Sequence, residues 1–133
     1  MGTMYNIACE SCGYAFGLMD GTGFFYDRLE TMINRLSPPH KAAVEAFQKA
    51  TEIKDWSAWM HVYECTSCND LSSHLYFRIY NDDGDALIVD YRCSKCSAEL
   101  KPVYGFDRSK HKCPRCGKHA LGNHPLLCDG NWD

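Results

Sequence analysis

The sequence predicts an α+β fold of two small β-rich units, the first of which carries a β-hairpin and a two-helix insert. Three observations predict it: Cys-x-x-Cys pairs recur four times in 133 residues, helical periodicity is confined to about 22–54, and strand-like segments flank the pairs. With 45% hydrophobic and 23% charged residues, the composition excludes a disordered chain. We expect an N-terminal unit at 1–90, a C-terminal unit at 91–120 and a loosely ordered tail at 121–133.

Eight of the nine cysteines form the four pairs. They are Cys9/Cys12, Cys65/Cys68, Cys93/Cys96 and Cys113/Cys116, and Cys128 stands apart. Two residues between cysteines allow a tight turn to direct both sulfurs toward one ion, and two such turns complete a tetrahedral site. The pairs therefore predict two four-cysteine metal sites of the zinc-ribbon kind, with two zinc ions expected. Iron is the alternative, because the first pair also has the pattern of a rubredoxin knuckle.

Disulfides and thiol redox chemistry are the other uses of such cysteines. The chain shows no basic, apolar leader, which favours an intracellular, cytoplasmic protein whose thiols stay reduced. The last pair has the spacing of a thioredoxin motif, but Gly117 follows it where that motif would open a helix. Glycine suits a metal-binding turn, because it accepts the positive φ that directs backbone amides toward the sulfurs.

Four pairs can share two ions in three ways. We expect the sequential arrangement, in which the first two pairs share one ion and the last two share the other, because the 16 residues at 97–112 fit the usual ribbon spacing. The nested arrangement, which joins the second and third pairs across 69–92 and brings the outer pairs together, stays open. Either one leaves no coordination position for water or substrate, so we expect structural metals and no enzymatic activity.

The elements are expected in the following order. Residues 4–8 and 14–18 are strands on either side of the first cysteine turn. Apolar residues recur at helical spacing over 25–36, after a Gly-rich turn. Ser37 then caps a second helix whose first turn holds two prolines, which are tolerated there because that turn needs no N–H. An aromatic segment at 56–64 leads into the second cysteine turn.

A β-hairpin is expected over residues 74–92. A two-residue turn at Asp83-Gly84 would set its register. The cross-strand pairs on one face are then Tyr80/Leu87, Arg78/Val89 and Tyr76/Tyr91. Both faces of the hairpin are substantially apolar, which favours burial of both within the chain. The alternative is a surface for a protein partner made by Tyr76, Arg78, Tyr80 and Tyr91.

The charge is unevenly distributed along the chain. Residues 1–90 hold 6 Lys/Arg against 13 Asp/Glu, and residues 91–119 hold 8 against 2, so the formal net charge of −3 conceals a basic C-terminal unit. Basic side chains with interleaved aromatic residues suit the phosphates and unpaired bases of nucleic acid. Equally, they could offset the negative charge of a four-thiolate site. The candidate nucleic-acid-binding residues are Arg92, Lys95, Lys101, Arg108, Lys110, Lys112, Arg115 and Lys118.

The tail has turn residues and no periodicity. It contains the ninth cysteine, and His119, His124 and Cys128 could form a further metal site, although an unligated thiol is the plainer interpretation. No apolar run in the chain approaches the roughly 20 residues of a membrane-spanning helix, so no membrane association is expected.

The first cysteine turn and the segment after it carry a family resemblance. Cys9-Glu-Ser-Cys12-Gly-Tyr-x-Phe16, followed by Leu18-Met-Asp-Gly-x-Gly-Phe-Phe25, resembles a group of small, uncharacterised bacterial zinc-ribbon proteins, and the likeness covers most of residues 5–116. It implies a cytoplasmic metal protein with a helical insert, in which the eight paired cysteines are the ligands. The tail and Cys128 have no counterpart in that pattern.

These observations predict a structural-zinc interaction module without a catalytic site. The first hypothesis is nucleic-acid binding through the basic C-terminal unit. The alternatives are a protein–protein adaptor that uses the aromatic hairpin, and a thiol redox sensor or rubredoxin-like iron protein. The sequence leaves the biological role and the oligomeric state open.

Overall fold

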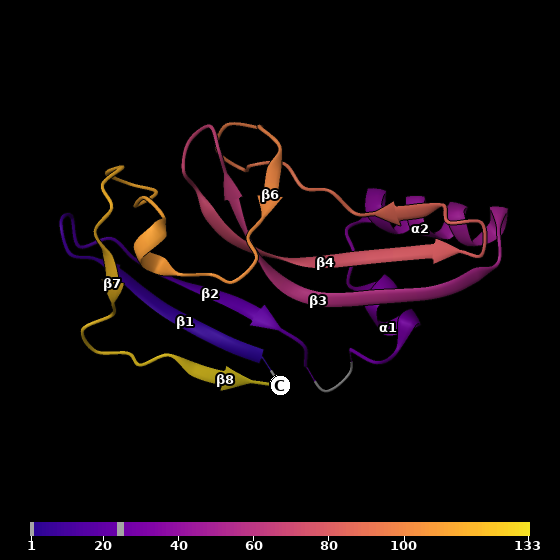
Figure 1. Cartoon of the computed structure of the whole chain (residues 1–133), viewed down its shortest axis with the longest axis horizontal. Coiled ribbons are helices and arrows are strands. Elements are labelled where there is room, and N and C mark those ends of the chain that lie inside the picture. Colours follow the sequence, from indigo (N-terminus) through magenta and orange to yellow (C-terminus); the bar gives the residue numbers. More distant parts are fainter. Residues whose placement is uncertain (1, 24–25) are drawn as a thin grey trace.

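The computed structural model describes residues 2–23 and 26–133 and contains an antiparallel sheet with two α-helices (Figure 1). The strands are β1 (Gly2–Cys9), β2 (Ala15–Gly21), β3 (Ile53–Cys65), β4 (Leu71–Asn81), β5 (Ala86–Ile88), β6 (Leu100–Pro102), β7 (Leu121–Asn123) and β8 (Gly130–Trp132). The helices are α1 (Leu29–Asn34), α2 (Pro38–Ala50) and the short 3₁₀ helix η1 (Arg108–Lys110). The strands follow the order β5-β4-β3-β2-β1-β7, with β6 also on β3 and β8 also on β1. The expected mixture of strands with two helices is confirmed.

The sheet has two halves that meet at a narrow joint. One half contains β1, β2, β7 and β8, and the other contains β3 to β6 with both α-helices (Figure 1). Strand β1 pairs with β2 over seven residue pairs and β3 with β4 over eleven, whereas β2 and β3 pair only at Gly21 and Met60. Side chains also cross the joint: the Met19 N–H donates to Ser73 Oγ at 2.7 Å and Asp20 lies 3.7 Å from His61. Ile7 and Leu18 share a hydrophobic cluster with Val62 and Leu71 of the other half.

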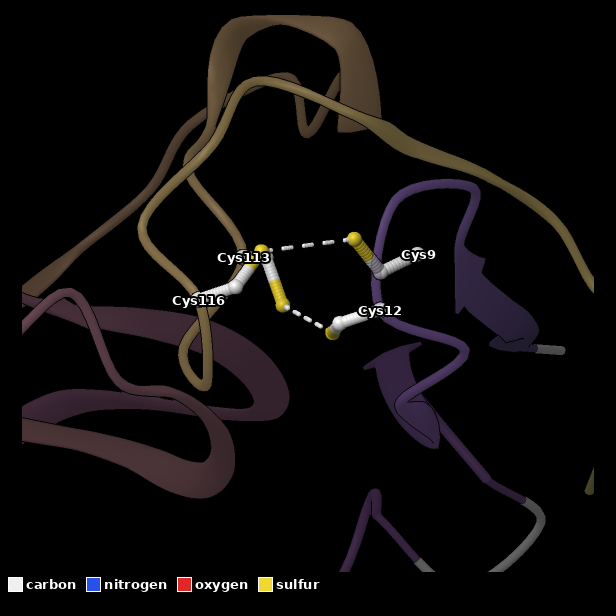
Figure 2. A group of neighbouring side chains, drawn as sticks. All are labelled: Cys9, Cys12, Cys113 and Cys116. Carbon is white, nitrogen blue, oxygen red and sulfur yellow. Dashed lines mark hydrogen bonds between the residues drawn. The ribbon is translucent and has the colours of Figure 1, made fainter.

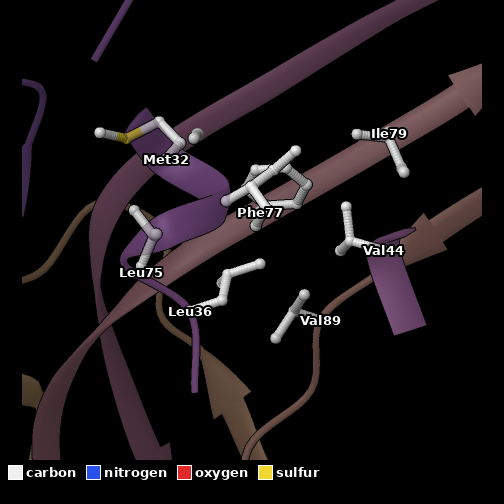
Figure 3. Packing of buried hydrophobic residues seen from close by; sticks show 9 residues of the cluster. Met32, Leu36, Val44, Leu75, Phe77, Ile79 and Val89 are labelled. Atoms are coloured by element: carbon white, nitrogen blue, oxygen red, sulfur yellow. The ribbon is translucent and has the colours of Figure 1, made fainter. Parts of the chain in front are cut away.

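The helical insert covers one face of β3 and β4. Helix α2 begins at Pro38 with Ser37 at its N-cap position, as predicted, but the Ser37 side chain makes no capping hydrogen bond. Helix α1 is shorter than the periodicity at 25–36 suggested and begins at Leu29. Residue 25, the first of that expected helix, lies outside the described residues. Alternate residues of β4 point toward the helices, which matches the two-residue period of a strand. The resulting core contains Met32, Leu36, Val44, Leu75, Phe77, Ile79 and Val89 (Figure 3).

The predicted register of the β4–β5 hairpin was wrong by one residue. Arg78 pairs with Ile88 and Tyr80 with Ala86, because the loop is longer than the two-residue Asp83-Gly84 turn. The buried Asn81 side chain organises this loop, since its Oδ1 accepts the N–H groups of Asp83 and Asp85 at 3.0 and 2.9 Å. A one-residue slip changes every cross-strand partner, so Tyr91 does not pair with Tyr76.

The tail differs from the loosely ordered segment that we expected. Residues 121–123 and 130–132 form β7 and β8, and both strands pair with β1. The Trp132 indole N–H donates to the Thr3 carbonyl at 3.1 Å, and a Cβ added at Gly2 would lie 2.2 Å from that indole. Strands of three residues are too short to give a periodic pattern, which explains why the sequence did not indicate them.

No helix in the described part of the chain is both long and apolar enough to span a bilayer.

Candidate metal centres

The eight paired cysteines gather into two groups of four. The outer tetrad is Cys9, Cys12, Cys113 and Cys116, and the inner tetrad is Cys65, Cys68, Cys93 and Cys96. This is the nested arrangement, so the favoured sequential pairing was wrong. The physical reason lies in β6, which pairs with β3 beside Cys65 and keeps the third turn next to the second. The 16 residues after Cys96 then place the fourth cysteine turn beside Cys9 at the end of β1, so the third and fourth turns do not form a ribbon.

The sulfur positions in both tetrads suit one metal ion each. Facing sulfurs are 3.7 Å apart in both pairs of the outer tetrad, Cys9 with Cys116 and Cys12 with Cys113 (Figure 2). In the inner tetrad the distances are 3.4 Å for Cys65 with Cys96 and 3.5 Å for Cys68 with Cys93. A tetrahedron with metal–sulfur bonds of about 2.3 Å has edges of about 3.8 Å. All nine thiols are free, so the eight paired sulfurs are available as ligands.

The four cysteine turns share one backbone conformation. In each turn the N–H of the first cysteine donates to the carbonyl five residues later at 2.8 Å, and the N–H four residues after that cysteine donates back to its carbonyl at 2.9 Å. The fifth residue of each turn has positive φ, and these residues are Gly13 (77°), Asn69 (65°), Ser97 (63°) and Gly117 (76°). Glycine adopts this conformation without strain and asparagine tolerates it. Ser97 is therefore the strained member of the set.

Backbone amides in these turns stabilise thiolates. The N–H groups of Lys95 and Arg115 each lie 3.4 Å from the sulfur of the cysteine two residues earlier. The amide of Cys12 is the largest of several causes that lower the pKa of Cys9 to about 7, and the amide of Cys68 does the same for Cys65, also to about 7. Each tetrad thus contains a sulfur that ionises readily near neutral pH.

The neighbouring sulfurs resist ionisation in the absence of a cation. The amide of Tyr14 favours the Cys12 thiolate, but burial and hydrogen bonds with the other three thiols outweigh it and raise the pKa of Cys12 to about 11. In the inner tetrad, the Asp70 amide is likewise outweighed and the pKa of Cys68 rises to about 12. Four thiolates this close repel one another, so only a bound cation allows all of them to ionise. The donor set therefore fits a thiophilic divalent metal.

Two cysteines of each tetrad are buried in the protein interior. Cys9 and Cys113 pack in a hydrophobic cluster with Ile7, Leu18, Val62, Leu71 and Leu121. Cys65 and Cys93 pack in a second cluster with Tyr63, Tyr76 and Leu100. A metal ion in either tetrad would have four sulfur ligands and would hold the surrounding apolar side chains in place. Such an ion would connect segments that are distant in sequence.

A connecting segment at residues 103–112 joins the two tetrads. Its first residue, Val103, donates its N–H to the Val62 carbonyl at 2.8 Å. Near its end, His111 Nδ1 is in hydrogen-bond contact with the carboxylate of Glu64, the residue before Cys65, and the His111 ring stacks on Phe106 with ring centroids 5.3 Å apart. Sequence analysis missed these two residues, because an isolated histidine and glutamate 47 positions apart carry no recognisable spacing.

Two of the eight candidate nucleic-acid-binding residues are engaged within the protein. Arg108 donates to the carbonyl oxygens of Asn6 and Gly122 at 3.3 and 3.4 Å and to Asn123 Oδ1 at 2.8 Å. It also forms an ion pair with Asp129, and its side chain is only 16% exposed. Arg108 thereby holds β1 and β7 together. The Lys95 ammonium lies 3.0 Å from Asp70, and its side chain stays 53% exposed.

The remaining six basic residues have exposed side chains. They are Arg92, Lys101, Lys110, Lys112, Arg115 and Lys118. Tyr104, in the connecting segment, is 69% exposed, and its ring lies 4.9 Å from that of His61. An accessible aromatic ring therefore lies within the basic part of the chain.

The four residues suggested as a surface for a protein partner have different environments. Tyr76 is buried and stacks on Trp59 at 4.5 Å, and the Tyr91 ring stacks on His74 at 4.5 Å. Arg78 is exposed, and its guanidinium lies 5.2 Å from the centre of the half-exposed Tyr80 ring. Tyr76 is therefore inaccessible to a partner, Arg78 is exposed, and Tyr80 and Tyr91 are each partly exposed.

The suggested third metal site at His119, His124 and Cys128 is not assembled. His124 Nδ1 accepts the N–H groups of Leu126 and Leu127, both at 3.0 Å, and is therefore used within its own loop. Cys128 is exposed, and no third cluster of metal-binding side chains occurs within residues 2–23 and 26–133.

Comparisons of this chain with protein families, with curated proteins and with solved structures give no match. The residues themselves therefore carry the evidence for the metal centres. They provide two cysteine tetrads, each near enough to hold one metal ion.

Proposed function

We propose that each tetrad binds one zinc ion and that both ions are structural. The sulfur–sulfur spacing of 3.4–3.7 Å carries this proposal, because it is close to the edge of a tetrahedral zinc–thiolate site in both tetrads. Backbone amides directed at the sulfurs further support bound thiolates. With four sulfur ligands, the ion has no position for substrate and acts by holding segments together.

The metals stabilise parts of the chain that have small cores. Strands β6, β7 and β8 have three residues each, and such strands bury little surface. Structural zinc binding contributes about 10–16 kcal/mol in zinc-finger peptides, and this energy becomes folding energy because the unfolded chain has no preformed site. We therefore assign the order of the C-terminal segment mainly to the metals.

Elemental analysis of the purified protein tests the metal proposal. We expect two zinc ions per chain, and one per chain after Cys113→Ser. Cys128→Ser serves as the matched control, because Cys128 belongs to neither tetrad, and it should retain both ions. Stoichiometric iron with visible colour would contradict the zinc assignment and favour a rubredoxin-like iron protein.

The function that the exposed residues support best is binding of single-stranded nucleic acid. Among the residues that the structure describes, the six exposed basic side chains form no ion pair with a carboxylate. Phosphate binding by such free cations is favourable, and an accessible tyrosine can stack on an unpaired base. Tyr104 supplies that ring. The metals would hold these side chains on one rigid scaffold.

Fluorescence anisotropy with a labelled single-stranded oligonucleotide tests this function. We expect affinity that falls steeply with salt and that is lost when Lys110, Lys112 and Arg115 all become Glu. The matched control is Lys41→Glu, Lys49→Glu and Lys54→Glu, which makes the same charge change in the acidic half and should affect binding much less. Weak binding that ignores salt, or equal losses in both triple variants, would contradict the proposal.

The two alternative functions give different outcomes in related experiments. A protein adaptor predicts a complex that survives the basic charge reversal and fails on changing Tyr80. A thiol redox sensor predicts reversible release of zinc by mild peroxide. Retention of both zinc ions under peroxide would exclude the redox alternative.

A further inference from the structure

A cleft of about 350 Å³ lies between the helical insert and the joint of the two half-sheets. The turn between α1 and α2 supplies Arg35, Leu36 and Ser37, and β4 supplies Ser73 to Leu75. Tyr26, Met60 and Tyr91 complete the lining, and no tetrad cysteine takes part. This volume falls at the small end of the range for ligand sites, so the cleft suits a small organic molecule.

The lining combines an apolar surface with a few polar groups. Leu36 and Leu75, which are also part of the helix-covered core in Figure 3, provide apolar surface together with Met60. Tyr26 and Tyr91 add aromatic surface. Apolar walls with a small number of polar groups that converge on the space are typical of sites for small molecules.

Most polar groups of the lining already have partners. Ser73 Oγ accepts the Met19 N–H at 2.7 Å, and His74 Nε2 lies 2.9 Å from Ser72 Oγ. Ser37 Oγ lies 3.0 Å from His40 Nδ1, and the Tyr91 hydroxyl donates to the Leu75 carbonyl. The exception is the guanidinium of Arg35, which has a large surplus of N–H donors.

Arg35 lacks the partner that its surroundings would be expected to provide. Residues 1–90 hold 13 carboxylates against 6 basic side chains, yet across the described ranges none of these carboxylates forms an ion pair with Arg35. Among the described residues, Arg35 has one hydrogen bond, a long one of 3.5 Å to the Tyr26 hydroxyl, and its guanidinium lies 5.2 Å from the Tyr26 ring centre. The guanidinium is therefore held beside the cleft with its donors largely unused.

The charge of the site fits a carboxylate better than a phosphate. Phosphate sites commonly use free amides at a helix N-terminus, but Pro38 and Pro39 occupy the first turn of α2 and have no N–H. Burial lowers the pKa of His74, so the imidazole is neutral at pH 7. One guanidinium remains, and its planar fork matches the two oxygens of a carboxylate.

We propose that this cleft binds a small organic monocarboxylate, with Arg35 pairing with the carboxylate and the apolar walls enclosing an aliphatic or aromatic body. The lining contains no tetrad cysteine and none of the basic residues proposed to bind nucleic acid, although Tyr91 also packs on the cluster that includes Cys65 and Cys93. The cleft adds a small-molecule site to a protein whose other features serve structure and macromolecular binding.

The test is an NMR titration of the zinc-loaded, ¹⁵N-labelled protein with benzoate, and with benzamide as the uncharged probe of the same shape. We expect saturable shifts at the amides of 35–37 and 73–75, with benzoate binding about tenfold tighter than benzamide, as a charge-assisted hydrogen-bond pair provides. Arg35→Gln should weaken benzoate binding by a similar factor and leave benzamide unchanged. Arg35→Lys should bind benzoate with an affinity between those of the wild type and Arg35→Gln, because lysine keeps the charge and lacks the planar guanidinium fork.

Lys49→Gln is the matched control, because it removes one positive charge from the last turn of α2 and should leave benzoate binding unchanged. Arg35 is exposed, so its replacement should preserve the dispersed spectrum of the folded protein. Equal affinity for benzoate and benzamide, equal affinity of wild type and Arg35→Gln, absence of saturable shifts, or shifts confined to the basic residues 110–118 would each overturn the proposal.

Discussion

The two tetrads use the same cysteine turn but connect very different lengths of chain. In the inner tetrad, facing cysteines are 25 and 31 residues apart in sequence. In the outer tetrad, they are 101 and 107 residues apart. The inner tetrad also stands on the long strands β3 and β4, which the helices cover, whereas β7 in the outer half has three residues.

This comparison indicates that the structure around each tetrad affects its stability more than the length of the loop that it closes. Closing a loop of about 100 residues instead of about 30 costs only about 1 kcal/mol more, because each doubling of length adds about 0.6 kcal/mol. The hydrophobic core against β3 and β4 contributes far more, since each fully buried large side chain stabilises by about 1.5–3 kcal/mol. We therefore expect the inner half to form first and the outer tetrad to close last.

The largest expected effect on stability comes from removing one cysteine ligand from either tetrad, in two separate variants. Cys113→Ser should abolish metal binding at the outer tetrad alone and release the C-terminal segment. The binding free energy lost would be on the scale of about 10–16 kcal/mol. Cys65→Ser should impair both ions, because the inner site positions β6 and hence the connecting segment that carries Cys113. Zinc content and hydrogen exchange measure both results. Equal behaviour of the two variants would contradict the asymmetry.

A core substitution in each half tests how narrowly the halves are joined. Phe77→Ala should destabilise the helix-covered half by about 3–5 kcal/mol, because Phe77 is fully buried. Leu18→Ala is the counterpart in the other half and should cost about 2–5 kcal/mol. We expect each variant to lose hydrogen-exchange protection mainly in its own half, since β2 and β3 share one residue pair. Leu18→Ala should also reduce protection near Val62 and Leu71, which share its hydrophobic cluster. Uniform loss across both halves would show a single cooperative unit.

The fifth residue of the cysteine turns offers a smaller comparison between the tetrads. Ser97 in the inner tetrad has φ of 63°, so Ser97→Gly should relieve strain and stabilise the protein by up to about 1 kcal/mol. Gly117 in the outer tetrad has φ of 76°, so Gly117→Ala should destabilise it by about 1 kcal/mol or more. Thermal unfolding at fixed free zinc measures both. The same sign for both substitutions would contradict the backbone argument.

The smallest effect concerns pH and the joint between the halves. Burial lowers the pKa of His61, although Asp20 opposes this, and the Trp59 indole N–H donates to His61 Nδ1 at 3.1 Å. A lowered folded-state pKa means that the folded protein binds fewer protons than the unfolded chain, so this stability is present above about pH 6.5 and is lost as the pH falls.

His61→Gln should therefore reduce the loss of stability between pH 7 and pH 5.5, because glutamine can accept the indole N–H without titrating. His74 retains its own contribution, since burial lowers its pKa as well. Chemical unfolding at several pH values measures the slope, and acid release of metal affects both proteins alike. An unchanged or steeper slope in the variant would contradict this role of His61.

The local features of the molecule could be predicted from the sequence. The Cys-x-x-Cys spacing and the glycines at 13 and 117 indicated the metal turns, because the turn is made within six residues. Ser37 with two prolines indicated the start of α2 for the same reason. In each case the deciding interactions lie close together in the chain.

The long-range features could not be predicted in this way. The nested pairing depends on β6 joining β3, and the sequence of three strand residues does not specify a partner. The hairpin register depends on a buried Asn81 that bonds the loop amides, which a turn signal at Asp83-Gly84 does not reveal. Arg108 looked like a surface cation, but the chain folds around it and uses its donors internally.

The most direct test of the account is to identify which cysteines share an ion. Protein loaded with ¹¹³Cd in place of zinc gives metal resonances that couple to the β-protons of the ligating cysteines. We predict two resonances, one correlated with Cys9, Cys12, Cys113 and Cys116 and the other with Cys65, Cys68, Cys93 and Cys96. One resonance that correlates with both the first and the second cysteine pair would contradict the nested arrangement and the asymmetry that follows from it.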